Sequence, residues 1–197
     1  TRWELMSDPG QLKQLSQETG FHFKGKLMIR NILDFLVNEV GVEKITQKVT
    51  HSLDDLTVAC YYGCLNTRVP KPETFDVMEY PMSMDHIASA LGARVVDWSY
   101  KTECCGASLF LTMDSISEKL VGKILRDASL RGVDCITVSC PMCQTNLDTK
   151  QARIRDEYDI DRPLPSPFIT QLMGLAFGCQ PEEVGLDKNF EKMEPWA

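Results

Sequence analysis

The sequence predicts an α/β fold in which short parallel strands alternate with helices. Three short apolar segments have the composition of buried strands, at residues 56–60, 93–98 and 135–139. Segments with helical character separate them, and strands connected through helices pair in parallel with right-handed crossovers. We therefore expect a Rossmann-like parallel sheet, preceded by a helical N-terminal lead-in.

The lead-in covers residues 1–54. We expect a short helix at 11–19, a longer one at 27–40 and another short one at 42–49. The middle helix is predicted because its apolar residues recur at helical spacing and Gly41 follows them. The apolar stripe consists of Ile29, Ile32, Leu33, Leu36, Val37 and Val40.

Residues 55–180 form the expected sheet domain, and residues 181–197 form an irregular tail. In the longest helix, Ser115 and Glu118 have the spacing of a capping box. The expected elements around the strands are a proline-containing loop at 66–82, a helix at 84–91 capped by Ser83, a helix at 114–130, a helix at 141–158 that begins at Pro141, and a helix at 168–177.

The overall composition argues against several classes of protein. The chain has 197 residues, which is enough to bury a full core without cross-links. A net charge of −7 and a pI near 5.0 argue against a nucleic-acid partner, because phosphate binding requires a basic face. No transmembrane segment, signal peptide or glycine-rich nucleotide-binding loop is visible. We expect a cytoplasmic protein with reduced thiols, and the opening Thr1-Arg2 suggests a fragment.

Five of the eight cysteines form one pattern. Cys64 is followed after 39 residues by Cys104-Cys105-Gly106, and after 33 more by Cys140-Pro-Met-Cys143. Each of the three groups follows the end of a predicted strand. Because the carboxyl ends of parallel strands lie at one edge of a sheet, we expect the groups to meet there. Clustered thiols in a reducing compartment indicate metal or redox chemistry more often than disulfides.

The ligand inventory favours an iron–sulfur cluster over a single zinc ion. Structural zinc takes four ligands, usually from two C-x2-C pairs, whereas this chain offers one such pair and five thiols. Adjacent residues such as Cys104 and Cys105 do not both point comfortably at one ion, but they can bind different irons of a cluster. Cys140 and Cys143 meet the positive end of a helix, which lowers thiol pKa values. Zinc, thiol–disulfide chemistry and structural cysteines remain alternatives.

The other cysteines have simpler interpretations. Cys60 is the rival of Cys64 for the first ligand position, but it lies inside the predicted strand whereas Cys64 lies in the turn beyond it. We expect Cys135 and Cys179 to be small buried apolar residues.

Charged residues near the site have two interpretations. Arg68, Lys101 and Glu103 lie close to the cysteines in sequence, and the two basic residues would attract an anionic substrate. The alternative is that they are merely exposed to solvent. His86 is expected on the outer face of its helix rather than as a ligand.

The cysteine pattern resembles the signature of the cysteine-rich CCG domain. The segments around it resemble the C-terminal half of the B subunit of heterodisulfide reductases, and this likeness covers nearly the whole chain. One CCG motif is present where that subunit has two, and the gap from Cys105 to Cys140 is a residue or two shorter than usual. The segments are Ala59-Cys-Tyr-Tyr-Gly-Cys64, Lys101-Thr-Glu-Cys-Cys-Gly-Ala-Ser108 and Ser139-Cys-Pro-Met-Cys-Gln-Thr-Asn-Leu-Asp148.

The resemblance implies a noncubane [4Fe–4S] cluster as cofactor, with zinc or an empty site after aerobic preparation. It implies reductive cleavage of the mixed disulfide of coenzymes M and B in methanogenesis, with partner subunits of the A and C types as electron donors. The implied ligands are Cys64, Cys104, Cys105, Cys140 and Cys143.

Two functions are therefore expected alternatives. The first is a catalytic subunit, or its C-terminal half, which would be inactive as an isolated chain. The second is an electron-relay module, as in related quinone-linked complexes and in lactate, glycolate and glycerol-3-phosphate oxidising systems. A substrate must reach the cluster, so the catalytic function requires a cysteine edge that the lead-in and tail leave open.

Overall fold

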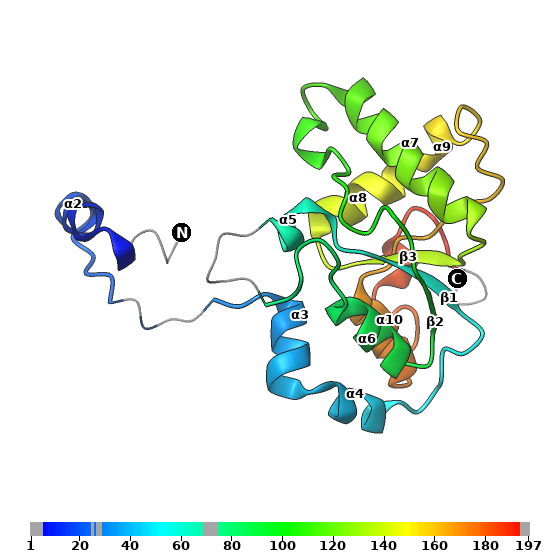
Figure 1. Ribbon diagram of the computed structural model, residues 1–197, viewed down its shortest axis with the longest axis horizontal. Coiled ribbons are helices and arrows are strands. Elements are labelled where there is room, and N and C mark those ends of the chain that lie inside the picture. The colour runs from blue at the N-terminus through cyan, green and yellow to red at the C-terminus, as the bar shows by residue number, and fades with distance from the viewer. Residues whose placement is uncertain (1–5, 25, 27–28, 69–74, 194–197) are drawn as a thin grey trace. The chain divides into compact units, whose positions relative to one another are not determined.

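A three-stranded parallel sheet is the centre of the larger part of the chain (Figure 1). The central strand, β1 (Thr57–Tyr61), lies between β2 (Arg94–Val96) and β3 (Cys135–Val138), and Ala59 pairs with a residue of each neighbour. Both pairings are parallel, so the predicted α/β fold with a parallel sheet is confirmed.

The structure is a computed structural model that describes residues 6–24, 26, 29–68 and 75–193. The chain forms two compact units, Thr1–Arg30 and Asn31–Ala197, and the second contains the sheet.

The first unit contains the helix α2 (Pro9–Thr19), close to its predicted position. Asp8 caps it, because its carboxylate accepts hydrogen bonds from the backbone N–H groups of Gly10 and Gln11, at 2.9 and 3.1 Å. Gly20 ends the helix with a left-handed backbone, φ 70°.

In the second unit, helices cover both faces of the sheet (Figure 1). Successive side chains of a strand point to opposite faces, so Val58 and Cys60 join one apolar cluster and Ala59 and Tyr61 join the other. On the first face lie α3 (Ile32–Asp34), the π-helix η1 (Phe35–Val40), α4 (Val42–Lys48), α6 (Ser83–Ala90) and α10 (Ile169–Ala176). On the second lie the 3-10 turn η2 (Ala107–Leu109), α7 (Asp114–Leu130), α8 (Pro141–Thr149) and α9 (Gln151–Ile154).

The helix predicted at 27–40 begins later than expected. Asn31 caps it by accepting a hydrogen bond from the N–H of Leu33, at 2.9 Å, and residues 27–28 lie outside the described ranges. The predicted apolar stripe is only partly correct. Leu33 and Leu36 are buried, but Ile29 precedes the helix and Ile32 is 43% exposed. The change to π-helical turns from Phe35 onward alters the spacing on which the stripe was based.

The predicted cap of α6 is wrong. Ser83 is the first residue of the helix, so Met82 occupies the N-cap position. The carboxylate of Asp76 instead accepts hydrogen bonds from the backbone N–H groups of both residues, at 2.8–3.2 Å. A side chain six residues upstream therefore replaces the local cap.

The helix α7 has the predicted bounds, but its predicted capping box is wrong. Met113 is its N-cap residue and makes no side-chain hydrogen bond there. Glu118 forms an ion pair with Arg153 of α9, at 2.5 Å, and is not turned back to the helix start. Asp114 pairs with Lys150, which is buried.

The single helix predicted at 141–158 is two helices, α8 and α9, and it ends at Ile154. A turn follows in which Asp159 has a positive φ of 47°. The short helices α5 (Gly63–Thr67) and η3 (Leu186–Lys188) complete the described elements.

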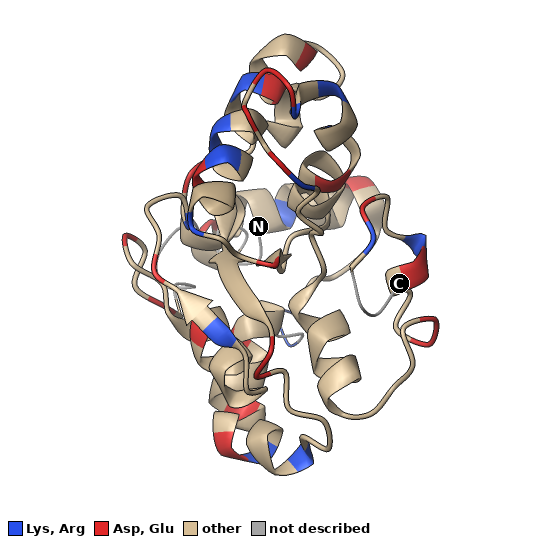
Figure 2. Ribbon diagram, turned by 90° about the vertical axis from the view of Figure 1, so that its right-hand side faces the viewer, with Lys and Arg blue, Asp and Glu red and all other residues tan. Residues whose placement is uncertain are grey.

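Basic and acidic residues are interspersed along the outer helices and loops, while the strands contain few of them (Figure 2). No helix within the described ranges is both long enough and apolar enough to cross a bilayer.

Candidate metal centre

The five candidate cysteines lie beyond the carboxyl ends of the strands. Cys64 is the second residue of α5, so it lies in a short helix where a turn was expected. Cys104 and Cys105 lie in the loop between β2 and η2. Cys140 is the N-cap residue of α8, and Cys143 is its third residue. The sheet topology thus carries three distant segments of the chain to one edge (Figure 1).

Four of these thiols form two close pairs. The sulfur atoms of Cys64 and Cys104 are 3.7 Å apart, and those of Cys105 and Cys143 are 3.6 Å apart. The Cys143 thiol also perturbs the pKa of Cys140, which links the fifth cysteine to the second pair. In the part of the chain that the structure describes, no three or more His, Cys, Asp or Glu side chains surround a point suited to one metal ion.

The pairs differ in their access to solvent. Cys105, Cys140 and Cys143 are 2%, 5% and 3% exposed, whereas Cys64 and Cys104 are half-buried. An external molecule therefore reaches Cys64 and Cys104 before the three buried thiols.

Two of the buried thiols have a lowered pKa. The neighbouring Cys143 thiol is the main cause that lowers the pKa of Cys140 to about 6; burial opposes this, and the N–H groups of Cys143 and Met142 at the start of α8 assist it. The pKa of Cys105 is also lowered to about 6, and the thiol of Cys143 is again the main cause. The pKa of Cys143 is raised, because it shares its proton with both neighbours. The site therefore favours thiolates at Cys105 and Cys140, the form that binds metals.

Glycine is required where the segments approach most closely. Gly106 has φ +75°, and a Cβ there would lie 2.9 Å from Leu120 Cδ1 and 3.1 Å from Ser117 Cα of α7. Its N–H donates to the sulfur of Cys104, at 3.3 Å. Gly63 has φ +64°, and a Cβ there would lie 3.0 Å from the sulfur of Cys143. These two glycines let the three cysteine segments come together.

Two buried side chains that sequence reasoning missed contact the cysteine loop. The amide of Asn146 donates to the carbonyl oxygen of Cys105, at 2.7 Å. The hydroxyl of Tyr61 donates to the carbonyl oxygen of Glu103, at 2.6 Å. Asn146 belongs to the same sequence segment as Cys140 and Cys143, but only its burial one helical turn after Cys143 indicates a role.

Lys101 is neither solvated nor available to a substrate. It is 3% exposed, its ammonium group lies 2.7 Å from the carboxylate of Asp85, and it lies 4.6 Å from the ring centre of Tyr80. Both interpretations offered for this residue are therefore wrong, because its charge is neutralised inside the protein. Arg68 is exposed, and its charge tends to lower the pKa of Cys64, although burial and Cys104 raise it overall.

The other three cysteines and His86 differ in their exposure to solvent. Cys60 is fully buried in β1 beside Asp85, away from the two sulfur pairs. Cys135 is buried as predicted, but Cys179 is exposed, so its prediction as a buried apolar residue is wrong. His86 is exposed on α6, as expected.

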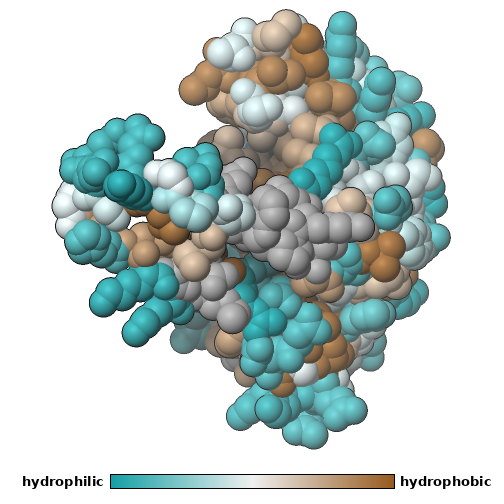
Figure 3. All heavy atoms as spheres, turned by 60° about the vertical axis from the view of Figure 1, so that its left-hand side comes forward, coloured by the Kyte–Doolittle hydropathy of each residue, from teal (hydrophilic) through white to brown (hydrophobic). Residues whose placement is uncertain are grey.

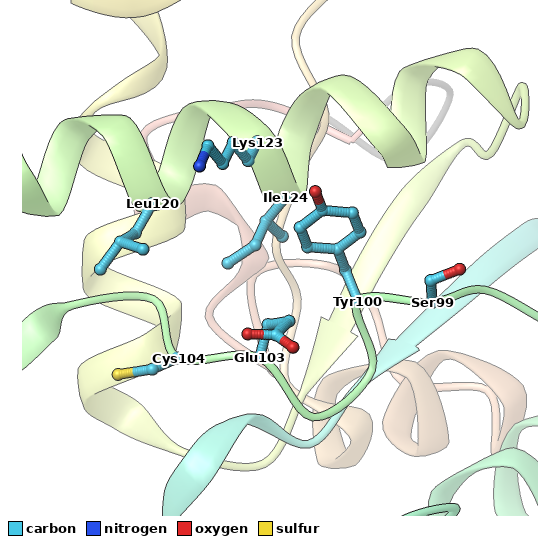
Figure 4. Close-up of a pocket in the computed structure, with 7 residues that line it drawn as sticks. All are labelled: Ser99, Tyr100, Glu103, Cys104, Leu120, Lys123 and Ile124. Carbon is cyan, nitrogen blue, oxygen red and sulfur yellow. The ribbon is translucent and has the colours of Figure 1, made fainter.

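A cavity of about 330 Å³ lies between the cysteine loop and α7 (Figure 4). Tyr100 of the loop and Leu120 and Ile124 of α7 provide its apolar surface, and Glu103 and Lys123 provide charge. Figure 4 shows Cys104 at one end of this cavity. A small molecule bound there would extend along the loop toward the half-buried thiol.

The C-terminal tail is attached away from the cysteine edge. The carboxylate of Asp148, near the far end of α8 from Cys140, accepts hydrogen bonds from the N–H groups of Phe190 and Glu191, at 2.7 and 3.1 Å. The lead-in helices α3 and α4 pack in the apolar cluster of α6 and α10. The start of the lead-in does reach α5, where Asn31 hydrogen-bonds with Asn66, at 2.7 Å, but Cys64 and Cys104 stay half-buried.

Comparison with known proteins gives one family and several relatives. Residues 58–148 match a family model described as the CCG cysteine-rich domain. The B subunit of the ferredoxin/F(420)H(2)-dependent CoB-CoM heterodisulfide reductase of Methanosarcina acetivorans is 34% identical over 94% of this chain. The 8-methylmenaquinol:fumarate reductase membrane anchor subunit of Wolinella succinogenes is 30% identical over 96% of this chain, which spans 67% of that protein.

The chain spans 63% of the length of the Methanosarcina acetivorans relative. A crystal structure of a hypothetical protein from Helicobacter pylori matches 97% of the chain with a TM-score of 0.69 and 13% identity, and the match covers 35% of that protein. At that identity, the likeness concerns the fold alone.

Proposed function

Because the chain belongs to the CCG cysteine-rich domain family, we propose that it is the catalytic iron–sulfur subunit of a heterodisulfide reductase, or the C-terminal half of one. The observation that carries the proposal is the meeting of five cysteines from three segments at one sheet edge, as two sulfur pairs with Cys140 beside the second. Its homologues place it in an oxidoreductase family.

The donor set fits an iron–sulfur cluster. Five thiols exceed the four that a single zinc ion takes, and an adjacent pair such as Cys104 and Cys105 suits two different irons. The lowered pKa values of Cys105 and Cys140 favour thiolates without any metal. We propose a noncubane [4Fe–4S] cluster, with the ligands Cys64, Cys104, Cys105, Cys140 and Cys143.

The proposed reaction splits a mixed disulfide, such as that of coenzymes M and B, into two thiols. The sulfur–sulfur bond takes up two electrons, each sulfur takes up one proton, and partner subunits supply the electrons. When bound, the cluster supplies electrons one at a time and an iron that accepts a thiolate. The chain itself buries Cys105, Cys140 and Cys143 from water and leaves the side of Cys64 and Cys104 accessible.

The surface beside the cysteines supports the proposal of partner subunits, which we take to be of the A and C types. Large apolar side chains are exposed next to the candidate ligands, and Figure 3 shows hydrophobic residues gathered over η2 and the start of α7. A patch of this kind is typical of surfaces that bind another protein, a membrane or a ligand. Its residues, with their exposed fractions, are Leu65 64%, Leu111 91%, Met113 50% and Met142 55%.

An electron-relay module is the second candidate. The likeness to the membrane anchor subunit of a quinone-linked fumarate reductase favours it, as does the burial of three of the five thiols. A relay needs no route for a disulfide, only a short distance to the next redox centre.

Metal analysis and spectroscopy test the proposal in two steps. Anaerobically reconstituted protein is expected to hold about four iron and four sulfide per chain, since five thiolates exceed the needs of one ion. One tightly bound zinc without sulfide would overturn the cluster. Adding the mixed disulfide of coenzymes M and B should then change the paramagnetic signal of the loaded protein. A signal that no disulfide changes would favour the relay.

A further inference from the structure

The amide of Asn146 connects three parts of the site. Asn146 is 1% exposed and lies one turn after Cys143 on α8. Its Nδ2 donates to the carbonyl oxygen of Cys105, at 2.7 Å, and its two amide atoms lie 3.0 and 3.2 Å from Ser117 Oγ of α7. Both N–H groups of the amide are thereby used, one on the cysteine loop and one on α7. One side chain therefore ties the backbone of Cys105 to α7 and α8.

A second buried donor reaches the same loop from the sheet. Tyr61 is fully buried at the end of β1, and its hydroxyl donates to the carbonyl oxygen of Glu103, at 2.6 Å. Cys104 and Cys105 therefore lie in a stretch of backbone that β1 holds at Glu103 and α8 holds at Cys105.

We infer that Asn146 and Tyr61 are positioning residues that hold the Cys104-Cys105 loop in the geometry that a cluster requires. The inference rests on the proposed function. Groups that hydrogen-bond around metal ligands orient those ligands, and their loss lowers the affinity for the metal. Removing either donor releases one of the two carbonyl groups that fix the loop.

A purely structural role would not require this arrangement. Gln151 on α9 provides the comparison, since it is a fully buried amide that hydrogen-bonds with Leu147 and Leu164, at 2.7–3.0 Å. It makes as many bonds as Asn146, but none with a candidate ligand. Losing it should cost stability without affecting the cluster.

The test measures iron and sulfide per chain and the electron paramagnetic resonance spectrum after anaerobic reconstitution. It compares wild type with Tyr61→Phe, Asn146→Leu and the control Gln151→Leu. We expect each of the first two changes to lower the iron and sulfide content and to alter the spectrum of the cluster that remains, because the loop no longer holds its two cysteines in place. Gln151→Leu should leave the content and the spectrum unchanged.

The possible outcomes separate the positioning role from the proposed function. Wild-type iron content and an unchanged spectrum in both Tyr61→Phe and Asn146→Leu overturn the inference, whereas a wild-type chain that takes up no iron and sulfide overturns the proposed function itself. If Asn146→Leu does not fold, Tyr61→Phe decides alone, because it removes a single oxygen atom. A folded variant that loads less iron than Gln151→Leu at equal thermal stability supports the positioning role.

Discussion

The ammonium group of Lys101 and the carboxylate of Asp85 form an ion pair at 2.7 Å in which both side chains are almost fully buried. The hydroxyl of Tyr62 donates to the other carboxylate oxygen, at 2.6 Å. The carbonyl oxygen of Lys101 also accepts hydrogen bonds from the N–H groups of Tyr62 and Gly63, at 2.8 and 3.1 Å. This network fixes the start of the loop that carries Cys104 against the end of β1.

Removing the carboxylate of this pair should strongly destabilise the protein. Asp85→Ala leaves the Lys101 charge buried without a partner, and we expect a loss of about 3–5 kcal/mol in the free energy of unfolding. Chemical denaturation under reducing conditions measures it. The exposed pair of Arg131 and Asp127 is the control, and Asp127→Asn should cost about 0.5 kcal/mol at most. Equal costs at the two sites would contradict the importance of burial, and adding Lys101→Met should restore part of the loss.

Gly106→Ala should lower the free energy of unfolding by more than the strain of a left-handed backbone at alanine accounts for. Gly132 has a similar φ of +65°, but a Cβ added there would meet no atom within 4 Å, so Gly132→Ala isolates the backbone strain, about 1–2 kcal/mol. At Gly106 the added Cβ also meets Leu120 and Ser117, and overpacking of this kind costs about 1–3 kcal/mol more. Denaturation of both variants gives the difference, and iron loading should fall only in Gly106→Ala.

Serine substitution should divide the cysteines into two groups. Serine at any proposed ligand should remove or alter the cluster, as judged from iron, sulfide and absorption spectra. Cys135→Ser and Cys179→Ser should keep the cluster, and only the first should lose stability, because Cys135 is buried and Cys179 is exposed. If Cys60→Ser abolishes the cluster and Cys64→Ser does not, the first ligand is misassigned.

The attachment of the tail should depend on pH through Asp148. Burial is the main cause of the raised pKa of its carboxyl, although the N–H groups of Phe190 and Glu191 oppose it. The folded protein therefore binds this proton more tightly than the unfolded chain. The stability it contributes is complete below the ordinary pKa of 3.8 and is lost as pH rises through the folded-state value.

Asp148→Asn has no ionisable group at this position and isolates the effect. The free energy of unfolding of the wild type minus that of the variant should fall as pH rises from about 3.8. Urea denaturation of both proteins over the acidic range gives this difference. A difference that rises with pH would mean that hydrogen bonding to the carboxylate outweighs its burial.

Local patterns in the sequence predicted the elements that depend on local interactions. The helix Asp114–Leu130 has its predicted bounds, and the strands lie within a residue or two of theirs. The alternation of strands and helices was enough to predict that the cysteine segments meet at one sheet edge. The ligand roles of these cysteines stay predictions.

The errors arose where distant residues take over a local role. Asp76 replaces Ser83 as the cap of α6, and Arg153 draws Glu118 away from the expected capping box. Lys101 looked like a solvated residue because its partner, Asp85, lies on another element. Such contacts leave no periodic pattern in the sequence, so they follow only from the folded arrangement.

The spacing of the sulfur pairs along the chain also bears on how the site matures. Cys64 and Cys104 are 40 residues apart, and Cys105 and Cys143 are 38 apart. The first pair requires β1 to have paired with β2, and the second requires β3 as well, because closing loops of this length costs entropy that strand pairing offsets. A group that needs all five thiols therefore finds them together only after the sheet has formed. We expect the proposed cluster to be inserted late, into a folded chain and through the side on which Cys64 and Cys104 remain accessible.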